Sequence, residues 1–139
     1  MVQRDYLEVQ IEQLGRALGR IVAEFPGTRA RGSVSEAIEV TNESLKAQLD
    51  LDADCLVWQN TSNLANYLAQ RNLSGERLAP LAEYLVALAE HKMATHRSQA
   101  LAVYRSVLQL YEIMDTTTDL RSLERFAQEE KINRILEQA

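Results

Sequence analysis

The chain contains few of the residues that build disulfides, tight turns and membrane spans. It has one cysteine, Cys55, among 139 residues, so no intramolecular disulfide can form, as is typical of a reducing compartment. Five glycines and two prolines are too few for the repeated turns of an all-β fold. No apolar run approaches the roughly 18 residues of a membrane span, and the first residues lack a signal-peptide pattern. We therefore expect a cytoplasmic protein built from long helices.

A basic surface is also missing. The formal net charge is −5, and residues 31–60 carry two basic and six acidic residues, a balance of −4. Nucleic acids and anionic membranes attract stripes of lysine and arginine, and no such stripe occurs in this chain. We therefore expect neither a nucleic acid nor a membrane as a partner.

The motifs of metal sites and enzymes are incomplete. Residues 50–54 carry alternating aspartates, as a calcium loop does, but Cys55 and Thr61 stand where that loop needs Gly and Glu. His91 and His96 are five residues apart, whereas zinc-binding histidines on one helix face are four apart. No phosphate-binding glycine loop, nucleophile elbow or Cys-x-x-Cys pair is present. The sequence predicts no metal, no cofactor and no enzymatic activity.

Two apolar stripes occupy residues 76–115, and in each stripe the apolar residues recur every three or four positions. The first stripe consists of Leu78, Leu81, Ala82, Leu85, Leu88 and Ala89, and the second of Ala100, Leu101, Tyr104, Val107, Leu108, Tyr111 and Met114. Only residues 92–98 can form the turn between them. The pattern predicts a hairpin of two packed helices in which Leu85 faces Tyr104.

The rest of the chain completes an all-α fold of five to six helices in a single domain, residues 1–139. A long N-terminal helix over 1–25 ends at Pro26, which lacks a backbone donor, and 26–32 is a polar linker. The helical body spans 33–139, with Ser33 as the N-cap of its first helix.

Further helices are expected over 62–71 and 120–138, the latter long and C-terminal. The last helix is weakly periodic, because Leu120, Leu123 and Ala127 share a face that does not include Ile132.

Short motifs near both ends of the chain support a family comparison. They are Arg4-Asp-Tyr-Leu, Ile11-Glu-Gln-Leu-Gly-Arg16, Asp115-Thr-Thr-Thr-Asp-Leu-Arg-Ser-Leu-Glu-Arg125 and Lys131-Ile132. In this order, and with the hairpin between them, they resemble a family of small bacterial proteins of unknown function. The resemblance implies a tetratricopeptide-like fold, the TPR-like helical hairpin, and no assigned activity.

A polar stripe follows the helix over 62–71. It consists of Asn63, Asn66, Tyr67, Gln70 and Arg71, which recur at steps of three and four. Tetratricopeptide grooves hold peptides with amide, aromatic and basic side chains, so these residues are the candidate site for a peptide or protein partner. The alternative is a solvated helix face.

The N-terminal helix offers a second candidate surface. Gly15 and Gly19 are spaced so that another helix can approach closely, in the same chain or in a dimer. With the adjacent apolar stripe they define a candidate dimer interface of Leu7, Ile11, Leu14, Gly15, Leu18 and Gly19.

Three functions are open from the sequence alone. The leading expectation is a noncatalytic protein–protein interaction module with a protein or peptide partner. One alternative is a structural homodimer whose interface is the N-terminal helix. The other is an enzyme or metal protein with an unrecognised site.

Overall fold

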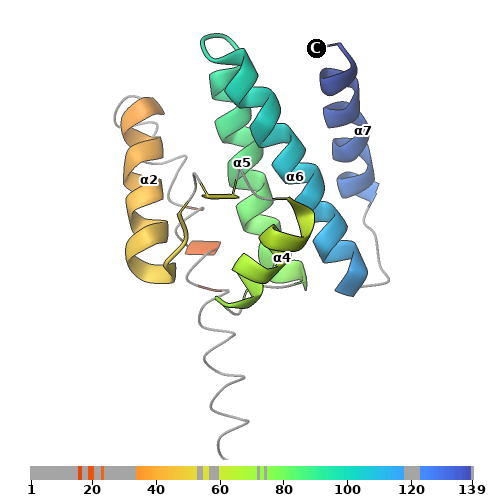
Figure 1. The fold of residues 1–139 in the computed structure, drawn as a ribbon. Helices are drawn as coiled ribbons and strands as arrows, with labels where there is room; N and C mark the ends of the chain where they lie inside the picture. The colour runs from red at the N-terminus through yellow and green to blue at the C-terminus, as the bar shows by residue number, and fades with distance from the viewer. Residues whose placement is uncertain are drawn as a thin grey trace, which may run out of the picture.

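The computed structural model describes a helical protein (Figure 1). The described residues are 16, 19–20, 23, 34–52, 55–56, 60–71, 73, 75–117 and 123–138. Their elements are α2 (Val34–Leu49), α4 (Thr61–Ala69), the 3₁₀ helix η1 (Gly75–Leu78), α5 (Ala79–Lys92), α6 (Arg97–Thr117) and α7 (Leu123–Glu137). These five α-helices, with no strand among the described residues, confirm the predicted all-α fold.

The hairpin of α5 and α6 forms the centre of the molecule, and the two helices pack along each other (Figure 1). Pro80 lies in the first turn of α5, where its missing N–H removes no helical hydrogen bond. Both predicted stripes are buried, except for the half-buried Leu108. The packing of α5 on α6 confirms the predicted hairpin. Leu85 and Tyr104 are both buried in the same cluster, and their direct facing stays a prediction.

The hairpin differs from the prediction at its ends. A 3₁₀ turn precedes α5, and its first residue, Gly75, has a φ of 58°, a conformation that favours glycine. At the other end α6 continues to Thr117, beyond the predicted limit at residue 115. The connection between the end of α5 at Lys92 and the start of α6 at Arg97 is short. Across it, the His96 N–H donates to the carbonyl oxygen of Lys92 at 2.7 Å.

The helix α2 lies on the α5 side of the hairpin and buries Ala37, Thr41, Leu45 and Leu49, which are spaced four residues apart. Thr41 is polar, but its hydroxyl donates to the carbonyl oxygen of Ala37 at 2.8 Å, which satisfies it inside the core. The helix ends where Asp50 adopts a φ of 54° and its N–H donates to the carbonyl oxygen of Lys46.

The helix α4 packs against α6 and buries Leu64 and Leu68. Asn60 caps it, since its side-chain oxygen accepts a hydrogen bond from the Asn63 N–H at 2.8 Å. Just before α4 in the chain, the carbonyl oxygen of buried Leu56 accepts a hydrogen bond from the Ser106 hydroxyl of α6 at 3.1 Å.

The helix α7 packs on the other side of α6 (Figure 1). Ile132 of α7 is buried, whereas Ala127 is exposed. Ile135 and Leu136 are half-buried against the same core. The described face that docks is therefore centred on Ile132 and does not include Ala127.

The predicted N-terminal helix over 1–25 lies mostly outside the described residues, as does the linker over 26–32. Arg16, Gly19, Arg20 and Ala23 are described, and all four are helical.

Candidate interaction surfaces

The predicted polar stripe is divided between solvent and the protein interior. Asn63, Asn66 and Gln70 are exposed, whereas Tyr67 and Arg71 are partly buried. Gln70 and Arg71 lie just beyond the end of α4 at Ala69. The structure therefore places three of the five residues on an open face and gives the other two partners within the chain.

Tyr67 and Arg71 hold the segment that follows α2. The Asp52 N–H donates to the Tyr67 hydroxyl at 2.8 Å. The Arg71 guanidinium donates to the Asp50 carbonyl oxygen, and its Nη2 lies 3.2 Å from Asp50 Oδ2. It also stacks on the Tyr67 ring, with 3.7 Å between Cζ and the ring centroid. We call Asp50, Asp52, Tyr67 and Arg71 the polar cluster.

The polar cluster has a structural role that the sequence pattern does not show. Asp50 has a positive φ, which directs the chain away from α2. Its carbonyl oxygen then accepts from Arg71, which itself donates to the Tyr67 carbonyl oxygen at 2.9 Å. These bonds tie the C-terminal end of α2 to the C-terminal end of α4.

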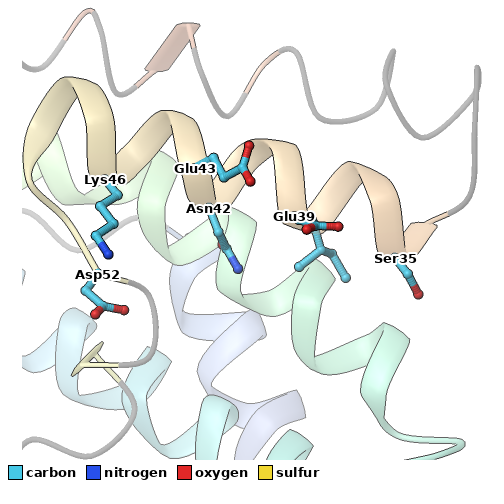
Figure 2. Close-up of a pocket in the computed structure, with 7 residues that line it drawn as sticks. Ser35, Glu39, Asn42, Glu43, Lys46 and Asp52 are labelled. Atoms are coloured by element: carbon cyan, nitrogen blue, oxygen red, sulfur yellow. The ribbon is translucent and has the colours of Figure 1, made fainter.

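A pocket of about 400 Å³ lies along α2 (Figure 2). We call it the α2 groove. Its described lining residues are Ser35, Ile38, Glu39, Asn42, Glu43, Lys46 and Asp52. Those on α2 recur at steps of three and four, so they share one side of the helix. From Ser35 to Lys46 this side extends for roughly 16 Å at the rise of an α-helix.

The lining of the α2 groove combines apolar and acidic groups. Ile38 is partly buried against the core, whereas Glu39 and Glu43 are exposed. The described lining has three carboxylates, from Glu39, Glu43 and Asp52, and one ammonium group, from Lys46. Figure 2 shows Lys46 and Asp52 together at one end of the groove and Ser35 at the other. The described lining therefore carries a net negative charge.

Asn42 connects the groove to the hairpin. The hydroxyl of Tyr84, a buried residue of α5, donates to Asn42 Oδ1 at 2.8 Å and lies 3.4 Å from the Ile38 carbonyl oxygen. Burial raises the pKa of Tyr84 well above its ordinary value of 10.0, so the hydroxyl keeps its proton as a donor. Because Tyr84 belongs to the core, it holds the groove face of α2 in a defined position.

Sequence reasoning missed the α2 groove. The only signal was the balance of −4 over residues 31–60, which contain all of its described lining. An acidic stretch by itself is typical of any solvated helix face. The concavity depends on how α2 sits beside α5, and neither the charge nor the spacing of its residues predicts that.

The candidate dimer interface is described at one residue. Gly19 is helical and half-buried, and a Cβ built there would meet no atom within 4 Å. Within the part of the chain that the structure describes, the space beside Gly19 that a side chain would occupy is therefore open. Leu7, Ile11, Leu14, Gly15 and Leu18 lie outside the described residues.

The groups considered for metal binding are dispersed. His91 and His96 are both exposed, and Cys55 is partly buried. Among the described residues, no three His, Cys, Asp or Glu side chains gather into a set that could hold an ion. In the same part of the chain, every helix is too short or too polar to cross a bilayer.

Comparison with protein-family models, with curated proteins and with solved structures gives no match for this chain. The resemblance described above is supported at the level of architecture, an all-helical protein with packed helix pairs.

Proposed function

We propose that the protein is a noncatalytic protein–protein interaction module and that a partner binds in the α2 groove. The observation that supports this proposal is the groove itself, which lies on an outer helix of a helical scaffold. Its described lining combines exposed polar side chains with the partly buried Ile38, Asn42 and Asp52. A surface of this kind offers both apolar contact and hydrogen bonds to a partner segment.

The proposal also rests on how the groove is supported. The hydrogen bond from Tyr84 to Asn42 joins it to the hairpin, and the polar cluster holds the end that contains Asp52. A partner would therefore meet a surface that is already arranged, which reduces the entropy lost on binding. Glu39 and Glu43 are exposed to solvent, whereas catalytic carboxylates lie in clefts that exclude water.

Site-specific photo-crosslinking tests the proposal. A photoreactive amino acid replaces Glu43 in the groove or, as a control, Glu112, which is exposed on α6. After irradiation in the native cell, we expect a discrete protein adduct from position 43 and none from position 112. Identical adducts from both positions, or no adduct from position 43, would contradict the proposal.

A further inference from the structure

The charge and shape of the α2 groove restrict what can bind there. Its described walls carry three carboxylates, and Lys46 is the single cation among them. Ionised carboxylates accept hydrogen bonds and donate none, so they select a partner rich in donors and positive charge. The groove thus differs in charge from the exposed residues of the polar stripe, because Asn63, Asn66 and Gln70 are uncharged.

The length of the groove restricts the partner further. The roughly 16 Å between Ser35 and Lys46 matches about five residues of an extended peptide. Glu39 and Glu43 are one helical turn apart on the same side of α2 and so present two anionic positions along that length. Ile38, between Ser35 and Glu39, gives the aliphatic part of a lysine or arginine side chain a surface to cover.

We propose that the occupant of the α2 groove is an extended basic segment of a partner protein, with lysine or arginine side chains paired to Glu39 and Glu43. This inference rests on the proposed function and adds the chemistry of the partner. Lys46 is positively charged and repels a basic segment, so it limits how tightly such a segment binds. It favours segments that place no cation beside it.

Fluorescence anisotropy with two labelled peptides tests this inference. The first probe consists of Lys-Ser-Arg-Ala repeats, and the second is its charge reversal, made of Glu-Ser-Asp-Ala repeats. We expect the basic peptide to bind at low salt and the acidic one not to bind. Binding should weaken as salt is added, because the contacts are exposed ion pairs.

Three variants separate the groove from the net charge of the protein. Glu39→Gln combined with Glu43→Gln should weaken basic-peptide binding about two- to tenfold, as expected for two exposed ion pairs. Glu112→Gln combined with Glu130→Gln removes the same charge at exposed sites outside the groove lining and should leave binding nearly unchanged. Lys46→Gln should strengthen binding. Because glutamine and glutamate have similar helix propensities, the double variants are expected to fold.

Equal weakening by the two double variants would overturn the inference, since binding would then follow net charge alone. Equal binding of the acidic and basic peptides would also overturn it. In the crosslinking protein the photoreactive residue already replaces Glu43, and Glu39→Gln removes the second carboxylate. An adduct at position 43 that persists in this protein would leave the proposed function standing and reject a basic occupant. The opposite result would be no adduct at position 43 in the native cell while the protein still binds the basic peptide selectively. It would reject the interaction module but keep the preference of the groove for cations.

Discussion

The α5–α6 hairpin and the helix α7 are held in the fold by different amounts of apolar burial. The hairpin places most of both its stripes in the core, from Leu81 to Met114. Among the described side chains of α7, Ile132 alone is buried to that extent. Because tertiary packing supplies most of a helix's stability, the two regions should respond differently to the same kind of substitution.

The polar contacts of α7 do not make up this difference. Lys131 and Glu90 form an ion pair with 3.9 Å between their charged atoms, and both side chains are largely exposed. Arg125 lies 5.9 Å from the centroid of the Tyr111 ring. The exposed pair of Lys131 and Glu90 contributes little to stability, because water and salt screen it. Among the described side chains of α7, Ile132 is therefore the one most deeply buried in the core.

The largest effect is expected at the centre of the hairpin. Leu85→Ala should lower the free energy of unfolding by about 2–5 kcal/mol, because it removes buried methyl groups and leaves a cavity. Urea denaturation followed by circular dichroism measures the change. Leu108→Ala, at a half-buried position of α6, is the control and should cost less. A loss below about 1 kcal/mol at Leu85 would mean that the site behaves like the surface.

A smaller and more local effect is expected on α7. Ile132→Ala should cost about 2 kcal/mol, the low end of the range for buried residues, because the loss is limited to the docking of one helix. Hydrogen exchange should rise across α7 and stay slow in α5 and α6. Asn133→Ala, at the exposed neighbouring position, should leave the exchange unchanged. Faster exchange throughout the hairpin would show that α7 and the hairpin unfold as one unit.

The polar cluster differs from both the hairpin and α7, because hydrogen bonds and not apolar burial hold it together. Arg71→Ala should cost about 1–2 kcal/mol, since it removes hydrogen bonds to Asp50 and the stacking on Tyr67. Asp50 is 87% exposed, which keeps the charge contribution small. Arg71→Lys keeps the charge but not the forked geometry, so denaturation of this variant should show most of the same loss. Full stability of the lysine variant would show that charge alone holds the cluster.

The smallest effect is expected at the contact between α2 and the hairpin. Tyr84→Phe should cost about 0.5–1.5 kcal/mol, because it removes the hydrogen bond to Asn42 and keeps the ring in the core. Denaturation of Tyr84→Phe alone, of Asn42→Ala alone and of the double variant measures the coupling of the two residues. Additive losses would contradict a direct interaction.

Tyr84 also predicts how stability depends on pH. Burial raises its folded-state pKa above the ordinary 10.0, so at alkaline pH the unfolded chain loses this proton before the folded protein does. The stabilisation is complete below about pH 10 and is lost as the pH rises from the unfolded towards the folded pKa. Burial likewise raises the pKa of Tyr104 and of Tyr111. Tyr84→Phe should flatten the alkaline decline in unfolding free energy without abolishing it, whereas an unchanged decline would contradict this assignment.

The candidate surfaces show where prediction from the sequence stopped. Spacing placed Asn63, Tyr67 and Arg71 along one helical segment, but it did not show that Tyr67 and Arg71 are engaged with Asp50 and Asp52. The polar stripe was interpreted either as a partner site or as a solvated face. Neither interpretation included hydrogen bonds of Tyr67 and Arg71 with the segment that follows α2. The sequence indicated only that the residues of the α2 groove belong to an acidic stretch, and it did not predict that they line a pocket.

The sequence by itself determined the hairpin, because the spacing of apolar residues at three and four follows from the local geometry of a helix. Only the tertiary structure decided which face of α7 docks, where the groove lies and what Tyr67 and Arg71 bind. These features join residues far apart in the chain, separated by 15 positions for Tyr67 and Asp52, 21 for Arg71 and Asp50, and 42 for Tyr84 and Asn42. Local periodicity carries no information about such pairs, because they form only when whole helices pack together.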